Sequence, residues 1–214
     1  MDQAALQDRI RWGMNVAART VGLVTDLYRP AGALAPLALS NRVLRLHAAF
    51  QPHRGSIVHT NLYGDALWYG IFDAAYTRRG DYLVQSGRTL FIATQQGLSG
   101  PLCVQTNRRL TVTRALPPGN VGANAYGGLI QGNSRVLLQD WPASVLGVNG
   151  AGNPSAGLPT DTSIPFWTIL MPEWPGVVLQ PADIIGDDLG RSATVAAAEL
   201  TELGWRLTAK QASN

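Results

Sequence analysis

The sequence predicts a mainly β fold: an N-terminal α-helix followed by two tandem small β-barrel or sandwich units related by internal duplication. Two observations predict it. Short segments of alternating apolar residues, separated by turns rich in Gly and Pro, recur from about residue 35 onward. In addition, the segment 81–93 reappears as 183–196, with a Gly-Arg pair after an Asp-led strand and a loop that differs in length by one residue. The 214 residues suffice for two small domains, each with its own core.

Fainter similarities extend the repeat upstream. Residues 41–46 resemble residues 133–138, and the surroundings of Trp68 resemble those of Trp167. Downstream of the Gly-Arg turns, residues 102–104 align with residues 205–207. The repeating unit is therefore roughly 75–80 residues, which is too long for a solenoid repeat and suits a small domain.

Composition indicates a globular chain whose surface carries unusually few charges. Apolar residues make up 46% and charged residues only 14% of the sequence. Surfaces of this kind are often covered by neighbouring subunits, because interface centres are depleted of charge. No apolar run approaches the length of a membrane span, and the N-terminus lacks the apolar region of a signal peptide. We therefore expect no contact with a membrane.

The chain opens with a segment that predicts an amphipathic helix over residues 3–19. Asp2 is the expected N-cap, and Gly22 is expected to end the helix. A helix placed before a β domain either plugs a barrel end or docks on a partner, and the sequence favours neither. Its apolar stripe follows helical spacing and includes three candidate interface residues, Leu6, Ile10 and Met14, together with Ala17 and Val21.

Turn composition and strand pattern predict the domain boundaries. We expect an N-terminal helix and docking strand over residues 1–34 and a first β unit over residues 35–114. Residues 115–132, rich in Gly, Pro and Asn, form the expected linker. The second β unit then covers residues 133–214 and contains a long loop, 147–165, for which we expect a contact with a subunit or partner.

Charge is distributed unevenly along the chain. Residues 1–114 hold thirteen Arg and six Asp, whereas residues 115–214 hold four basic and eight acidic residues. Drift between two domains, head-to-tail packing of basic on acidic surfaces, and a basic face toward nucleic acid would each explain this. The candidates for a DNA-facing surface are Arg78, Arg79, Arg108 and Arg109.

The motifs that accompany catalysis and cofactor binding are missing from the sequence. His47, His53 and His59 are too far apart along a strand to share one metal ion. The acidic residues near Asp183 are typical of a turn, and no carboxylate pair has the spacing that glycoside hydrolysis needs. We therefore expect no enzyme activity, no metal and no cofactor, and we expect Cys103 to be a buried thiol.

The tryptophans have different expected roles. Trp68, Trp167 and Trp205 lie in strand patterns and are expected in the core. Trp141 and Trp174, each followed by Pro, lie beside expected loops. Structural packing, a protein interface and stacking on a sugar all fit these two residues.

Several of these motifs resemble tailed-bacteriophage virion structural proteins. The resemblance is carried by the Gly-Arg turns, by Leu27-Tyr28-Arg29-Pro30, by residues 80–84 and by residues 199–207. It implies a homo-oligomeric ring at the head–tail junction (neck) or in the short tail. Such a ring is assembled in the host cytoplasm into the virion and contacts the portal or neighbouring neck and tail proteins. It also implies non-specific contact with packaged DNA and no catalytic residues.

Two other functions stay open from the sequence. The first is a module that anchors a fibre or binds a host glycan through Trp141 and Trp174. The second is a cell-wall or glycan hydrolase, which would need a carboxylate pair that the sequence does not display.

Overall fold

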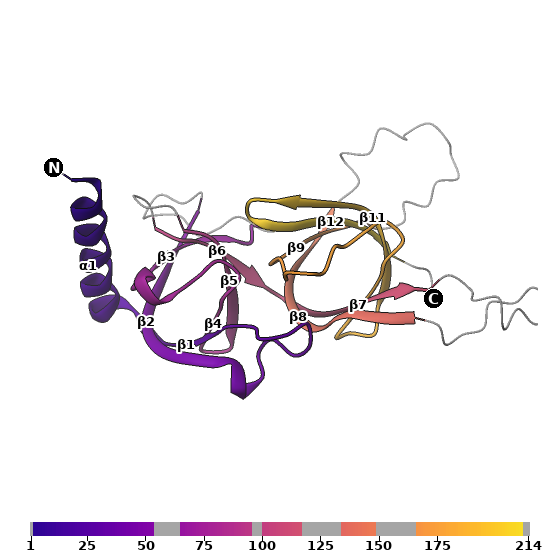
Figure 1. Ribbon diagram of the computed structural model, residues 1–214, viewed down its shortest axis with the longest axis horizontal. Coiled ribbons are helices and arrows are strands. Elements are labelled where there is room, and N and C mark those ends of the chain that lie inside the picture. The colour runs from indigo at the N-terminus through magenta and orange to yellow at the C-terminus, as the bar shows by residue number, and fades with distance from the viewer. Residues whose placement is uncertain (1, 54–64, 96–99, 117–133, 149–165, 212–214) are drawn as a thin grey trace, which may run out of the picture.

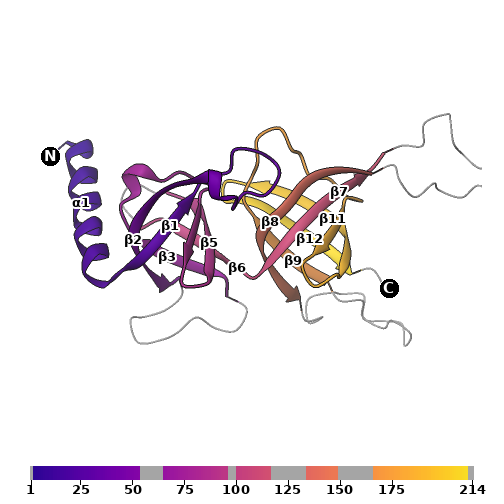
Figure 2. The same ribbon diagram turned by 90° about the horizontal axis from the view of Figure 1, so that it is seen from below.

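The computed structural model describes residues 2–53, 65–95, 100–116, 134–148 and 166–211. A helix stands at one end of an elongated molecule, and two β-barrels follow it along the long axis (Figures 1 and 2). The predicted fold class is confirmed: the chain is mainly β, with one N-terminal helix and two tandem β units.

The first barrel closes through six antiparallel strands in the order β1-β2-β3-β6-β5-β4, with β4 pairing back onto β1. A short 3₁₀ turn precedes β2 (η1, Leu39–Asn41) and another follows β3 (η2, Ala74–Tyr76). The strands are β1 (Leu23–Tyr28), β2 (Arg42–Pro52), β3 (Leu67–Ile71), β4 (Tyr82–Gln85), β5 (Arg88–Thr94) and β6 (Leu102–Thr106).

The second barrel closes in the equivalent order, β7-β8-β9-β12-β11-β10, again with every neighbouring pair antiparallel. Its strands are β7 (Arg108–Ala115), β8 (Ser134–Val148), β9 (Phe166–Met171), β10 (Ile184–Asp187), β11 (Ser192–Thr201) and β12 (Gly204–Gln211). Two barrels with one strand order agree with the duplication that the sequence repeat indicates.

Strand register repeats as well as strand order. Trp68 pairs with Cys103 in the first barrel, and Trp167 pairs with Ala209 in the second. The register of β5 against β6 shifts just after Ile92, and the register of β11 against β12 shifts at the equivalent place. A bulge kept at the same position in both copies indicates a common origin rather than a chance likeness of topology.

Each barrel is fastened by the same arginine–aspartate contact. Arg29, just after β1, donates through Nε and Nη2 to the carboxylate of Asp81, at 2.9 and 2.7 Å. Arg114, near the end of β7, does the same to Asp183, at 2.7 and 2.9 Å. In both barrels a backbone N–H three residues before the Asp also donates to its Oδ2, at 2.8 Å. Both carboxylates are buried.

A second repeated contact joins the first residue of β5 to β3, and the residue just before β11 to β9. The guanidinium of Arg88 lies 4.6 Å from the ring centre of Trp68, and Arg191 lies at the same distance from Trp167. These two arginines are the ones in the repeated Gly-Arg turns. Both copies of the repeat therefore contain a cation–π contact between an arginine and a tryptophan of the same barrel. The arginine of each Gly-Arg pair thus has a structural role.

The strands divide between the barrels differently from the predicted boundaries. β1 belongs to the first barrel and pairs with both β2 and β4, so residues 1–34 are not a separate docking unit. β7 belongs to the second barrel. Along the chain, the single residue Asn107 connects the last strand of the first barrel to the first strand of the second. The predicted linker, 115–132, therefore falls between β7 and β8 of one barrel, and residues 117–133 lie outside the described part. The Gly- and Pro-rich composition there does not mark a domain boundary, because β7 and β8 belong to one barrel.

The helix α1 (Gln3–Val21) runs two residues past its predicted end, and its predicted caps are confirmed. Asp2 accepts a hydrogen bond from the N–H of Ala4 at 3.4 Å, and Gly22 ends the helix. A Cβ at Gly22 would lie 2.4 Å from the Ala18 carbonyl oxygen, so only glycine fits this bend between helix and strand. The helix packs mainly against β2 and β3 and does not plug the barrel.

Candidate functional site

The junction between the barrels is a packed contact surface with buried aromatic side chains. Tyr82 of β4 donates its phenol O–H to the carbonyl of Pro142 in β8, at 2.9 Å. Its ring meets that of Trp141 edge-on, with centroids 6.2 Å apart. Because both side chains are fully buried, the barrels share one apolar core that reaches from Phe91 across the junction.

The segment between β1 and β2 reaches over the second barrel and strengthens this junction. Gln139 of β8 donates its backbone N–H to Ala33 and accepts from the N–H of Ala35, at 3.1 and 2.9 Å. Trp141 donates its indole N–H to the Ala33 carbonyl at 2.6 Å. These contacts tie a loop of one barrel into a strand of the other, which holds the two barrels as one block.

Of the three roles left open for Trp141 and Trp174, their placement agrees with structural packing. Trp141 lies within β8 with no exposed surface, and half-buried Trp174 packs against it at 5.9 Å between ring centres. Their interface is therefore internal to the chain. The alternation of Trp141, Ala143 and Val145 was the sequence signal for a buried strand position, and Pro142 obscured it.

The four candidate DNA-facing arginines do not present four free charges. Arg79 lies across the junction, 3.3 Å from the Glu173 carboxylate, and also donates to the Thr201 carbonyl at 3.2 Å. Arg109 pairs with Asp140 at 3.2 Å, and Arg108 lies 4.0 Å from Asp187. Among the described residues, only Arg78 of the four has no carboxylate partner, and its side chain is exposed.

The charge asymmetry also shrinks when the true barrel boundary is used. Residues 1–107 carry ten Arg and six Asp, whereas residues 108–214 carry seven basic and eight acidic residues. The net charges are therefore about +4 and −1. Three arginines counted with the first unit belong to β7, which lowers the net charge of the first part from about +7 to about +4.

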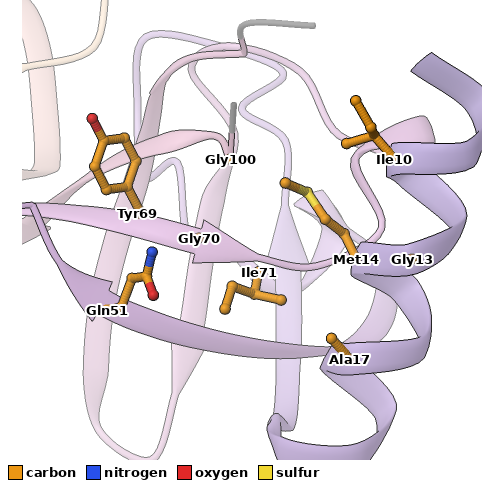
Figure 3. A pocket seen from close by; sticks show the side chains of 9 residues that line it. All are labelled: Ile10, Gly13, Met14, Ala17, Gln51, Tyr69, Gly70, Ile71 and Gly100. Atoms are coloured by element: carbon orange, nitrogen blue, oxygen red, sulfur yellow. The ribbon is translucent and has the colours of Figure 1, made fainter. Parts of the chain in front are cut away.

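A groove opens where α1 leans against the first barrel (Figure 3). Ile10 and Met14 point from the helix across the gap toward β3, and Tyr69 lies at its far edge. The cavity has a volume of about 550 Å³ and no charged lining residue. It is lined by Ile10, Gly13, Met14, Ala17, Gln51, Tyr69, Gly70, Ile71 and Gly100.

The groove is lined by two of the three predicted interface residues of the helix. Ile10 and Met14 are half-buried and line the groove, whereas Leu6 is 38% exposed and is not part of the lining. Sequence reasoning missed Trp12, which is 70% exposed, and Val16, which is 45% exposed. They lie one helical turn apart on the outer face of α1, and the prediction considered only the more continuous inner stripe.

A smaller groove, about 260 Å³, lies between α1 and β2. Arg19, Arg45 and His47 line it, but so does Asp73, and Arg45 is already bound to Asp26 at 2.7 Å. The opposing charges leave no net attraction for an anion.

Two titratable side chains in the described residues, Cys103 and Asp187, have a pKa shifted by burial or by hydrogen bonds within the fold. Burial raises the pKa of the Cys103 thiol, which has no exposed surface, so the side chain stays protonated. Burial would also raise the pKa of Asp187, but hydrogen bonds from the side chain and backbone of Arg191 hold it below its usual value. No group of three or more His, Cys, Asp or Glu residues in the described ranges could hold a metal ion. No described helix is long and apolar enough to cross a membrane.

No family model, curated protein or solved structure matches this chain. The functional argument therefore rests on the geometry of the two-barrel block, the groove and the outer face of α1.

Proposed function

We propose that the chain is a non-catalytic structural component of a tailed-phage particle, acting as a multi-copy ring at the head–tail junction or in the short tail through which DNA passes. The observation that carries this proposal is the internal junction: Tyr82, Trp141 and the Ala33 carbonyl lock two barrels into one block. A rigid block with an apolar groove at one end is suited to repeated docking. The resemblance of the Gly-Arg turns and of Leu27–Pro30 to phage virion proteins supports the same role.

The assigned partners are further copies of this chain and the portal or a neighbouring neck or tail protein. Carboxylates lie close to three of the four candidate arginines, which argues against a DNA contact through Arg79, Arg108 and Arg109. Arg78, exposed and without a carboxylate partner among the described residues, is the remaining candidate of the four. The loop 147–165, expected to make a partner contact, lies outside the described residues beyond Val148.

The test is assembly with portal rings from the same phage genome, followed by light scattering on a sizing column. We expect a complex with a fixed number of copies per portal ring. In particles, removal of the protein should give DNA-filled heads that do not join tails. A chain that binds neither portal nor any neck protein, and whose loss leaves infectivity unchanged, would contradict the proposal.

The proposed DNA contact has its own test. Replacing Arg78 by Glu reverses an exposed charge without breaking an ion pair in the described structure, so folding should be unaffected. Reduced retention of DNA in the head would support a channel position for this side chain. Unchanged DNA retention and infectivity would exclude a DNA contact through Arg78 and would not contradict the proposed ring.

The fibre-anchoring or glycan-binding alternative depended on Trp141 and Trp174. Since Trp141 is fully buried and Trp174 stacks against it, no observation favours this alternative.

A further inference from the structure

One edge of β8 in the second barrel is filled by a segment of the first barrel. Only Ser144–Val148 of β8 pair with β9, so the earlier part of the strand has no neighbouring strand on that side in the described structure. Leu34 forms a parallel bridge with Gln139 there. The backbone N–H of Gln139 donates to the Ala33 carbonyl, and the Gln139 carbonyl accepts from the N–H of Ala35. The chain thus adds a short partial strand to its own second barrel.

The equivalent edge of β2 in the first barrel is open. β2 pairs with β1 over Arg42–Ala48 but with β3 only over Ala49–Pro52. Among the described residues, no strand or isolated bridge lies on the β3 side of the stretch before Ala49. The smaller groove, of about 260 Å³, lies beside this stretch and is lined by four consecutive strand residues, Leu44–His47. Leu44–His47 are termed the open edge.

The open edge corresponds in register to the filled edge of β8. Leu44 of β2 and Leu138 of β8 each pair with the residue two positions before the arginine of the repeated arginine–aspartate contact. The next residue of β2 is Arg45, and β8 has an irregularity at this point that begins with Gln139. Backbone groups of successive strand residues point to alternate sides. The N–H and C=O of Arg45 therefore face away from β1, as those of Gln139 face away from β7.

An aromatic side chain stands beside each edge. Half-buried Trp174, from the segment between β9 and β10, packs against Trp141 at 5.9 Å between ring centres. Tyr76, from the segment between β3 and β4, lines the groove at the open edge and is 65% exposed. The filled edge therefore has a covered aromatic neighbour, and the open edge has an uncovered one.

The sequence contains a second copy of the segment that fills the edge of β8. Gly32–Ala35 (Gly-Ala-Leu-Ala) lies between β1 and β2, the first two strands of the first barrel. Gly122–Ala125 (Gly-Ala-Asn-Ala) lies between β7 and β8, the first two strands of the second barrel. The pattern Gly-Ala-x-Ala occurs nowhere else in the sequence. The duplicated unit thus carries this motif twice, and in the described structure only the first copy fills an edge.

We propose that Gly122–Ala125 of one copy adds to the open edge of β2 in a second copy, as Gly32–Ala35 adds to β8 within each chain. The inference rests on the proposed ring and names the contact that joins neighbouring copies in it. The groove beside the open edge is bordered by α1, whereas β7 ends and β8 begins at the opposite end of the molecule (Figures 1 and 2). The motif and the open edge of one chain therefore face different neighbours.

The proposed contact is made by the main chain. Main-chain hydrogen bonds supply the affinity when a segment adds to a strand edge, and small residues let two backbones approach closely. Residues 115–133 contain no charged side chain, so their addition buries no new ion beside Arg19 and Arg45 of the groove. The two patches differ, so the contact is heterologous and propagates until the rotation between copies closes a ring. One such contact is weak, and ring closure strengthens it by making the last contact intramolecular.

Disulfide trapping between two separately prepared chains tests the contact. The bridge that fills the edge of β8 aligns Asn124 with Arg45, within the spacing of a disulfide. In a Cys103→Ala background, one chain carries Arg45→Cys and the other carries Asn124→Cys, and their mixture is oxidised mildly. We expect a disulfide-linked heterodimer. Gln131→Cys replaces Asn124→Cys in the matched control, because Gln131 lies in the same segment outside the motif, and it should cross-link far more slowly.

Proline variants test the main-chain hydrogen bonds from both sides. Ala125→Pro removes the N–H that donates in the equivalent segment of the first barrel, so it should slow heterodimer formation by about tenfold, whereas Gln131→Pro should not. Arg45→Pro removes the N–H that corresponds to the one Gln139 donates, and Arg45→Ala keeps it. A fluorescent synthetic peptide of residues 117–133 should bind Arg45→Ala like the unaltered chain and Arg45→Pro about tenfold more weakly. Circular dichroism and thermal unfolding check that each variant folds.

Three outcomes would overturn the inference: a heterodimer no faster than the Gln131→Cys control, peptide binding that Arg45→Pro leaves unchanged, or no peptide binding at all. A chain that carries both Arg45→Cys and Asn124→Cys should form cross-linked oligomers, and a disulfide closed within one chain would also contradict a second copy as the occupant. The proposed function fails by a separate criterion, the absence of binding to portal and neck proteins. A ring that assembles on the portal without the Asn124–Arg45 cross-link would refute this contact and leave the ring proposal intact.

Discussion

The phenol of Tyr82 in the first barrel donates a hydrogen bond to the carbonyl of Pro142 in the second, at 2.9 Å, and the Tyr82 side chain has no exposed surface. Because the barrels share this bond and the core around Trp141, neither barrel can unfold without exposing apolar surface of the other. We therefore treat the two barrels as one cooperative unit of unfolding, joined at a contact that is internal to the chain.

Replacing Tyr82 by Phe should lower the free energy of unfolding by about 1–3 kcal/mol. The substitution keeps the ring contacts but leaves the Pro142 carbonyl without its donor, and a buried unsatisfied group costs that much. Urea unfolding followed by tryptophan fluorescence measures the change. Tyr69→Phe is the control, since Tyr69 lies at the edge of the open groove. A Tyr82→Phe chain as stable as the control would show that the bond across the junction contributes nothing.

Alkaline pH should destabilise the protein through the same side chain. Burial raises the pKa of Tyr82 well above its ordinary value near 10, so the folded chain keeps the phenol proton. The unfolded chain loses that proton above about pH 10, so stability that is full below this pH falls as pH rises further. Tyr82→Phe should flatten that decline.

Burial also raises the pKa of the Cys103 thiol. The unfolded chain loses this proton above about pH 8.5, so the thiol should lower the free energy of unfolding at a less alkaline pH than the phenol does. Cys103→Ala separates the two contributions when urea midpoints are measured from about pH 8 to about pH 11. If Tyr82→Phe and the unaltered chain lose stability in parallel above pH 10, the phenol is not the group responsible.

Removing the arginine of either repeated pair should destabilise the chain by similar amounts. Arg29→Ala leaves the buried carboxylate of Asp81 without its bidentate donor, and Arg114→Ala does the same to Asp183. Uncompensated buried charges cost roughly 3–5 kcal/mol, and partial exposure of the guanidinium groups reduces this to about 2–4 kcal/mol.

Arg45→Ala is the matched control for these pairs. Its side chain is 63% exposed while bound to Asp26, so its loss should destabilise the chain far less than the loss of Arg29 or Arg114. The Arg29–Asp81 and Arg114–Asp183 pairs lie in different barrels, so the losses in free energy of unfolding should add in the double variant. A marked difference between Arg29→Ala and Arg114→Ala would mean that the duplicated contact has lost its role in one barrel.

Local pattern in the sequence was enough to predict the fold class and several turns. At the first Gly-Arg turn, Ser86 and Gly87 both adopt positive φ, as a two-residue hairpin turn requires, and the strands on either side pair at Gln85 and Arg88. The helix caps Asp2 and Gly22 were predicted for the same reason, since capping depends on a few neighbouring atoms. Signals of this kind are contained in short stretches of chain.

Barrel membership depends on distant pairing and could not be read from the same signals. β6 and β7 are separated by Asn107 alone, so the alternating pattern runs through the boundary without a break. The repeat alignment was also wrong downstream: register places Leu102 opposite Thr94 and Thr208 opposite Ala197, so Leu102 corresponds to Thr208 rather than to Trp205. The longer hairpin of β11 and β12 causes this shift of three residues. The exposed Trp12 was missed because nothing in the sequence shows which helix face the barrel leaves open.

The thiol of Cys103 should react with a thiol reagent only when the whole two-barrel unit unfolds. Cys103 has no exposed surface and packs in the first-barrel core with residues such as Leu90 and Ile92. If no smaller opening exposes it, the free energy obtained from its labelling rate in native buffer equals that obtained from urea unfolding.

Trp141→Phe extends this test across the junction, because the substituted residue belongs to the second barrel and Cys103 lies in the core of the first. Loss of the indole hydrogen bond to Ala33 should destabilise the cooperative unit and accelerate labelling of Cys103 by the factor that matches the loss measured in urea. Val43→Cys in a Cys103→Ala background serves as the exposed reference and should react at once, since Val43 is 47% exposed. If Trp141→Phe leaves the labelling rate of Cys103 unchanged, the first barrel opens independently of the second. That result would refute the single cooperative unit.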